Sequence, residues 1–128
     1  MFTGYFGKMK SYPKTHGYRF VSIARFGKFW TGEEFKKLAP PAEIIKIRNE
    51  ELYTKLYYEK VLNKLNPQDV YEELGENAVL LCYESWESIK SGKTFCHRRI
   101  VAEWLQNNLC IEVKELDTDL EQISLKLQ

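Results

Sequence analysis

The chain has 128 residues, enough for one domain with a hydrophobic core, and its 44% hydrophobic and 29% charged residues are typical of soluble globular proteins. No apolar stretch approaches the roughly 20 residues that cross a bilayer, and "MFTGYFGKMK" at the N-terminus lacks the apolar core of a signal peptide. We therefore expect a single domain over residues 1–128, in the cytoplasm and without a membrane partner. In that reducing compartment Cys82, Cys96 and Cys110 are expected to be free thiols.

The net charge of +1 conceals an uneven distribution along the chain. Residues 1–32 contain six basic residues and no acidic residue, so they carry +6 and the rest of the chain carries −5. The same segment holds nine of the 18 aromatic residues. Basic side chains bind phosphate and aromatic rings stack on bases, so this basic-aromatic segment suits a nucleic acid or another anionic partner. Alternatively, the rings form part of a core and the lysines are its solvated edge.

Two short strands are predicted near the N-terminus. "MFTGYF" (1–6) and "YRFVSIAR" (18–25) are rich in aromatic and β-branched residues. The intervening "GKMKSYPKTHG" (7–17) contains Gly and Pro and indicates a loop. "ARFGKFWTG" (24–32) is irregular, and Pro40 disfavours helix in the residue before it.

Two helices are predicted in the middle of the chain. Asn49 is a candidate N-cap, and apolar residues follow it at helical spacing as far as Leu65. Asn66 caps the second helix, Pro67 occupies its first position and Gly75 stands just past its end.

The last third of the chain predicts strand, helix and strand. "AVLLCYE" (78–84) is a continuous apolar run, as expected of a strand buried on both faces of a parallel sheet. A helix over 95–106 and an alternating strand over 109–116 follow, while "DTDLEQISLKLQ" (117–128) fits either a short helix or a strand. The order of elements predicts an α/β fold, a single Rossmann-like domain with a mostly parallel sheet of about four strands flanked by helices.

The stretch "GKTFCHRRIVAEW" (92–104) places a thiol, an imidazole and a guanidinium in succession at the start of a predicted helix. Ligands of parallel sheets bind at the carboxyl ends of the strands, beside helix N-termini, and Cys82 lies at such a strand end. Free N–H groups and the helix dipole favour an anion there. We expect Arg98, Arg25 and Cys82 to bind a phosphate-bearing ligand.

Three neighbouring side chains are candidate catalytic groups. Cys96 beside a helix N-terminus and an arginine is a candidate thiolate nucleophile, with His97 beside it. Glu84 at a strand end is a candidate general base. In the alternative interpretation Cys96 is a small core residue and His97 a buried hydrogen-bonding group. We predict that Arg25, Glu84, Cys96, His97 and Arg98 converge around one cleft.

These residues predict a protein that binds a nucleotide-like or other phosphate-bearing small molecule at the Cys-His-Arg helix start, with enzymatic activity an open question. The alternative is a nucleic-acid-binding or partner-binding protein that uses the surface of residues 1–32. A steep dependence on salt distinguishes nucleic-acid binding from binding of a small ligand in a pocket.

Other site types find less support. "SGKT" (91–94) resembles part of a phosphate loop, but Glu87 stands where that motif needs glycine, and no nucleophile elbow is present. The candidate metal ligands are Cys82, Cys96, His97 and the distant His16. They include no C-x-x-C pair, and adjacent side chains reach one ion awkwardly, so we expect no stoichiometric zinc and no cofactor.

The stretch "VLLCYES…FCHRRIVAEWL" resembles the signature of a bacterial family, domain of unknown function 488. Its members carry an apolar strand ending in a cysteine and an acid, then Cys-His-Arg at the start of a helix. The matching residues are Cys82, Glu84, Cys96, His97, Arg98, Ala102 and Glu103.

The rest of the chain is similar to the short branch of this family in "YFGKMK", "VSIARFGKFWTG", "KKLAPP" and "YYEKVLNKLNPQDVYEEL". "IAR" (23–25) stands where many relatives carry Asp-Val-Arg. The resemblance implies an α/β Rossmann-like fold and a cytosolic location, and it implies no particular activity.

Overall fold

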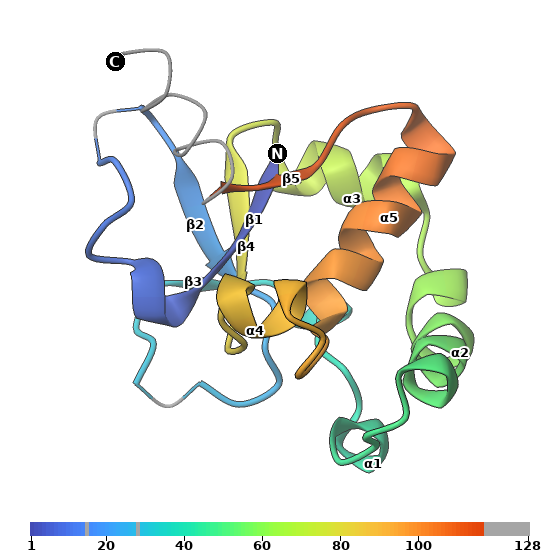
Figure 1. The fold of residues 1–128 in the computed structure, drawn as a ribbon. Helices are drawn as coiled ribbons and strands as arrows, with labels where there is room; N and C mark the ends of the chain where they lie inside the picture. The colour runs from blue at the N-terminus through green and yellow to red at the C-terminus, as the bar shows by residue number, and fades with distance from the viewer. Residues whose placement is uncertain (15, 28, 117–128) are drawn as a thin grey trace.

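The computed structural model describes residues 1–14, 16–27 and 29–116, and within them a five-stranded sheet forms the centre of the fold (Figure 1). The strand order is β3-β2-β4-β1-β5, and every neighbouring pair is parallel. The strands are β1 (Phe2–Tyr5), β2 (Arg19–Ser22), β3 (Glu33–Glu34), β4 (Ala78–Cys82) and β5 (Lys114–Glu115). The predicted α/β fold is confirmed, with one strand more than expected.

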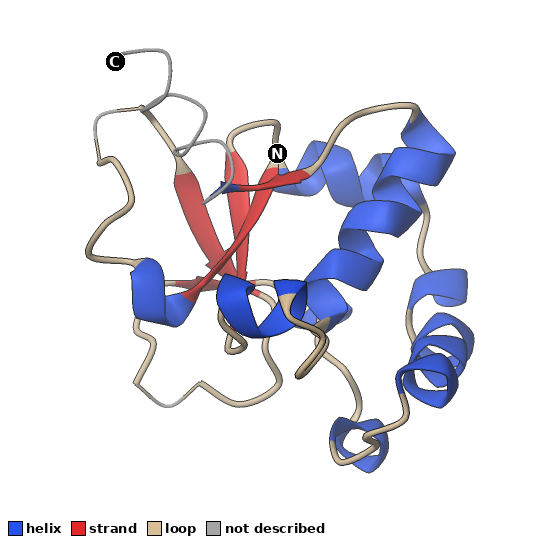
Figure 2. Cartoon of the chain, in the orientation of Figure 1, coloured by secondary structure: helices blue, strands red, loops and turns tan. Residues whose placement is uncertain are grey.

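The longer helices lie together on one side of the sheet (Figure 2). The α-helices are α1 (Ala42–Ile45), α2 (Glu50–Lys60), α3 (Pro67–Leu74), α4 (Trp86–Lys90) and α5 (His97–Leu109). There are also three short 3-10 helices in the described residues. η1 (Phe6–Lys8) lies between β1 and β2, η2 (Lys36–Leu38) between β3 and α1, and η3 (Leu62–Lys64) between α2 and α3.

Polar caps fix where α2 and α3 begin. The side-chain oxygen of Asn49 accepts a hydrogen bond from the backbone N–H of Leu52 at 2.8 Å. Asn66 accepts one from Asp69 at 3.1 Å, and Gly75, with φ of +89°, ends α3. Both predicted N-caps are confirmed, because each side chain satisfies a backbone donor that the helix itself leaves unpaired.

Strand β4 lies between two hydrophobic cores. All five of its residues are buried, which confirms the prediction from its continuous apolar run. Leu80 belongs to the larger core, which also contains Leu105 of α5. Val79 and Leu81 belong to a smaller core on the opposite face of the sheet, together with Tyr12. Because β4 is the central strand, its carboxyl end is held firmly from both faces.

Several boundaries differ from the sequence prediction. β3, α1 and α4 were not predicted, and α2 ends at Lys60 because Val61 leaves the helical conformation. α5 continues past residue 106 to Leu109 and ends at Cys110, which has a left-handed backbone with φ of +55°. The strand predicted over 109–116 is therefore shortened to β5, and the ambiguous segment 117–128 lies outside the described residues.

A buried ion pair joins the first turn of α5 to β5. The Nε and Nη2 atoms of Arg98 lie 3.0 Å from the Oε1 and Oε2 atoms of Glu115, and both side chains are fully buried. Thr3 on β1 donates a further hydrogen bond to Glu115 at 2.7 Å. Two parallel charge-assisted hydrogen bonds fix the direction of the arginine as well as its position.

We expect Arg98→Met to lower the free energy of unfolding by about 3–5 kcal/mol, because it leaves Glu115 buried without its counter-charge. Urea denaturation measures the loss. The matched control is Glu33→Gln, which removes an exposed ion pair with Arg19 and should cost no more than about 1 kcal/mol. The double variant Arg98→Met/Glu115→Leu should recover part of the stability, since no charge is then left unpaired. Equal losses for Arg98→Met and Glu33→Gln contradict the prediction.

Candidate functional site

A cavity of about 590 Å³ opens at the carboxyl ends of β2 and β4, where parallel sheets place their ligands. Its volume falls in the range of roughly 300–1,000 Å³ that is usual for small-molecule sites. The main contributions to its walls come from residues 24–26 after β2, 45–48 between α1 and α2, 82–84 at the end of β4, and 93–97 at the start of α5.

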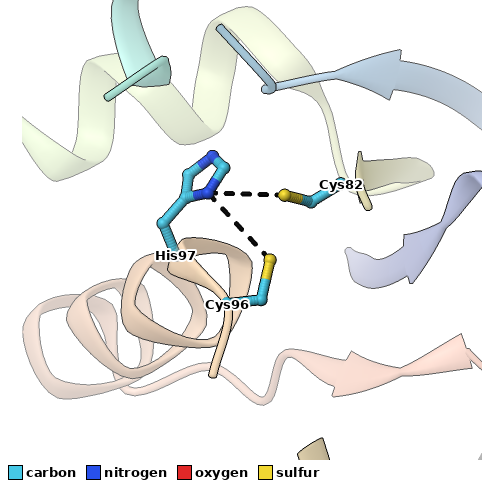
Figure 3. A group of neighbouring side chains, drawn as sticks. All are labelled: Cys82, Cys96 and His97. Carbon is cyan, nitrogen blue, oxygen red and sulfur yellow. Dashed lines mark hydrogen bonds between the residues drawn. The ribbon is translucent and has the colours of Figure 1, made fainter. Parts of the chain in front are cut away.

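Two thiols and an imidazole gather in this cavity, and we call Cys82, Cys96 and His97 the cysteine–histidine cluster. Figure 3 shows both sulfur atoms directed toward the same ring nitrogen. The Nδ1 atom of His97 lies 3.4 Å from the Sγ atom of Cys82 and 4.0 Å from that of Cys96. All three side chains are buried, and their ligand atoms lie within 4.8 Å of one another.

The geometry of the cluster follows from the end of β4 and the start of α5, which lie close together at the carboxyl edge of the sheet. Cys82 is the last residue of β4, and His97 is the first residue of α5. Cys96 is the N-cap of α5 and not part of its first turn as predicted, with extended φ and ψ of −140° and 140°. This backbone turns two adjacent side chains toward one point. The awkward mutual geometry expected from the sequence is therefore wrong.

A backbone hydrogen bond fixes the orientation of His97. Its Nε2 atom lies 2.8 Å from the carbonyl oxygen of Ile23, and its ring contacts the edge of the Tyr57 ring. A carbonyl oxygen only accepts, so Nε2 carries a proton and donates it to this bond. In the neutral ring Nδ1, which faces the two sulfur atoms, then has its lone pair free.

The two buried thiols differ in acidity. Burial, reinforced by the hydrogen bond and charge of Cys96, raises the pKa of Cys82 well above its usual value. Burial opposes ionisation of Cys96 too, but a hydrogen bond from the Cys82 thiol and the positive charge of Arg98 help to hold the pKa of Cys96 well below its usual value. Of the two thiols, Cys96 is therefore the one that loses its proton more readily.

Glu84 adds a carboxyl group beside the cluster. Its Oε2 atom lies 3.5 Å from the Sγ atom of Cys82. Burial, and then the charge of Cys96, raise the pKa of Glu84 to about 7. A carboxyl group that titrates near neutrality and lines a cavity fits the role of general base predicted from the sequence.

Basic side chains surround the opening. They are Arg25, Lys46, Arg48 and Lys93, all solvent-exposed and all part of the cavity wall. Glu84 is the one acidic residue among the described residues that line the cavity. Within the described part of the chain none of the four basic residues forms an ion pair. The cavity thus has an electropositive rim above a floor of sulfur and nitrogen ligands.

Exposed aromatic rings complete the rim. Phe26 and Tyr83 line the cavity with 61% and 47% of their surface exposed, and the Tyr83 hydroxyl donates a hydrogen bond to the carbonyl oxygen of Phe26. Phe29, which is also exposed, contacts the Tyr83 ring edge-on. Exposed rings beside a cavity are typical of sites that bind flat ligands.

Five of the six predicted site residues line this cavity, namely Arg25, Cys82, Glu84, Cys96 and His97. Arg98 does not. Its guanidinium is committed to Glu115, and its Nη1 atom donates to the backbone carbonyl of Glu84 at 2.8 Å. The prediction that Arg98 belongs to the cleft is therefore wrong, because a buried acid 17 residues along the chain holds it inside the protein.

Lys46, Arg48 and Lys93 were not predicted as site residues. The first two belong to the connection between α1 and α2, and only the packing of those helices brings the connection to the sheet edge. The basic stretch "KIR" (46–48) directly before the N-cap Asn49 was the one sequence signal for these two residues. It does not indicate which edge of the sheet the segment lies against.

The basic-aromatic segment 1–32 is largely structural in its aromatic part. Tyr12 is buried in the smaller core, and five more of its rings pack around that core: Phe2, Phe6, Tyr18, Phe20 and Trp30. The exposed Arg19 is paired with Glu33 at 2.7 Å. The alternative interpretation, in which the rings form a core, is confirmed for these residues, and exposed rings remain at the cavity rim.

Comparison of the chain with protein-family models, with curated proteins and with solved structures finds no match. The resemblance to domain of unknown function 488 therefore depends on its motif residues alone. In the described part of the chain, no helix combines the length and apolar character that crossing a membrane requires.

We expect the alkylation rate of Cys96 by iodoacetamide in reduced, chelator-treated protein to rise with pH and to level off at a lower pH than the rate of free cysteine does. A lowered pKa means that the thiolate of Cys96 forms at a lower pH than that of free cysteine. Cys82 should react more slowly than Cys96 at every pH measured. Peptide-resolved mass spectrometry measures both rates, with Cys110→Ser as background. A Cys96 rate that rises in parallel with free cysteine contradicts this assignment.

Proposed function

We propose that this protein binds a small phosphate-bearing, nucleotide-like anion in the cavity at the carboxyl edge of its sheet. The observation that carries this proposal is a rim of four basic side chains that form no ion pair within the described residues, around a cavity to which those residues contribute one carboxylate. Exposed cations that are not held in an ion pair are available to contact a ligand. They also attract an anion from solution before it enters the cavity.

The basic residues are arranged for a ligand with more than one anionic oxygen. Arg25 follows β2, Arg48 precedes α2 and Lys93 precedes α5, so the cations come from three separate segments of the wall. A phosphate group presents three oxygens and accepts hydrogen bonds from arginine in pairs. One phosphate can thus be contacted from several sides.

The aromatic rim supports a base-bearing ligand over inorganic phosphate. Phe26 and Tyr83 line the same cavity as Arg25, and both side chains are exposed to solvent. Stacking of a base on an aromatic ring is worth about 1–3 kcal/mol and depends little on which base is present. Keeping two large rings exposed next to the cations is costly unless a ligand covers them.

A cytoplasmic location is part of this proposal. Cys82, Cys96 and Cys110 are all free thiols, and nucleotide-like anions and a reducing environment occur together in that compartment.

We expect calorimetric titration with adenosine monophosphate and uridine monophosphate to detect binding of both, more tightly than inorganic phosphate. Arg48→Ala and Lys93→Ala should each weaken nucleotide binding about tenfold, because each removes a charge-assisted contact. Phe26→Ala should weaken the binding of both nucleotides and leave that of inorganic phosphate unchanged.

The matched control is Lys55→Ala, which removes an exposed cation on α2 outside the cavity and should leave every affinity unchanged. Equal binding by the control and the cavity variants overturns the proposal. So does binding of a single-stranded oligonucleotide that falls steeply with salt and is indifferent to the cavity variants, because that outcome supports the nucleic-acid alternative.

A further inference from the structure

We propose that the cysteine–histidine cluster is a metal site that binds one zinc-class divalent ion through Cys82 Sγ, Cys96 Sγ and His97 Nδ1, with its fourth coordination position open to the cavity. This inference reverses the expectation from the sequence that no metal binds. It is independent of the anion proposed for the same cavity.

The distances between the ligand atoms match tetrahedral coordination. With Zn–S near 2.3 Å and Zn–N near 2.1 Å, neighbouring sulfur and nitrogen ligands of one zinc ion lie about 3.6 Å apart. The two sulfur–nitrogen distances of the cluster are 3.4 Å and 4.0 Å. Two sulfur ligands need about 3.8 Å, and no two of the three ligand atoms are more than 4.8 Å apart. Side-chain adjustments of about 1 Å or less therefore complete the three-ligand set.

The surroundings of His97 are those of a metal ligand. Histidine ligands almost always donate their second ring N–H to a carbonyl or carboxylate, which fixes the ring and the tautomer. His97 does this through Nε2 to the backbone oxygen of Ile23 at 2.8 Å. Its Nδ1 atom faces both sulfur atoms (Figure 3), so the nitrogen that a metal needs is the one left available.

The ligand types select the metal. Two thiolates and an imidazole suit Zn²⁺ and related transition-metal ions, whereas Mg²⁺ and Ca²⁺ require oxygen ligands. Two thiolates also balance the charge of a divalent ion, which makes the occupied floor of the cavity close to neutral.

The cavity supplies both access and the open position. All three ligands are buried, yet all three line the cavity, so an ion can enter from solvent. Three protein ligands with a fourth position left to water or substrate distinguish catalytic zinc sites from closed structural ones. Glu84, 3.5 Å from Cys82 Sγ, stands beside that position with a carboxylate that can contact a metal-bound water.

The test uses full-length protein that has been reduced and stripped with a chelator. We expect one Zn²⁺ per chain by elemental analysis and native mass spectrometry after reconstitution and desalting. With Co²⁺ as the probe, we expect the charge-transfer absorption of cobalt–thiolate bonds. This spectroscopic signature reports sulfur coordination directly in the wild-type chain, so it does not depend on whether a variant folds.

The variants locate the site. Cys82→Ser and Cys96→Ser should retain less than about one tenth of a zinc ion per chain, because each removes a ligand. Cys110→Ser removes an exposed thiol at the end of α5 and should bind zinc as the wild type does. Wild-type protein without stoichiometric zinc, cobalt binding without charge transfer, or full zinc binding by both cluster variants would each overturn the proposal. The nucleotide titrations are carried out on chelator-treated protein in metal-free buffer, so a negative result for zinc leaves them unaffected.

Discussion

The buried pair of Arg98 and Glu115 is the contact on which the rest of the site depends. It ties the first turn of α5 to β5, and the Nη1 atom of the same guanidinium holds the carbonyl of Glu84. One side chain therefore sets the position of the loop after β4 and of the helix that carries two members of the cysteine–histidine cluster. Lysine cannot replace it, because a point charge lacks the fork that reaches two oxygens and a carbonyl together. Arg98 of the Cys-His-Arg motif therefore does not line the cavity; it is buried in the protein and positions the segments that do line it.

The parts of the fold that the sequence predicted are those with local signals. The caps of α2 and α3 need only a few neighbouring residues, and the apolar run of β4 needs only its own composition. β3 has just two residues, both glutamates, and forms because β2 offers it a parallel edge. β5 is shorter than predicted because Leu109 is the last residue of α5 and the chain then turns at Cys110, which has a left-handed backbone. The boundaries of such elements depend on contacts with neighbouring elements, so they cannot be predicted from the sequence of one segment alone.

The same distinction applies to the candidate site. Cys82, Glu84 and Cys96 could be placed together in advance, because the carboxyl ends of parallel strands and the starts of the following helices meet at one edge. The role of Arg98 could not be predicted, since Glu115 lies in a segment that alternates like a half-exposed strand and the ion pair forms only where α5 meets the edge strand β5. The convergence of the Cys82 and Cys96 sulfur atoms on Nδ1 of His97 could not be predicted either, because it depends on the extended backbone of Cys96 at the helix cap.

The two proposed ligands of the cavity favour each other electrostatically. The floor carries a carboxyl group and two sulfur atoms, and an anion entering between the basic walls approaches that floor. Without a metal, any negative charge on the floor opposes the phosphate that the walls attract. A divalent ion bound by the cluster cancels this charge and offers an open position to a ligand oxygen. Any gain in anion affinity from the metal must appear equally as a gain in metal affinity from the anion. The basic rim and the sulfur floor, which come from unrelated parts of the chain, then act as one site.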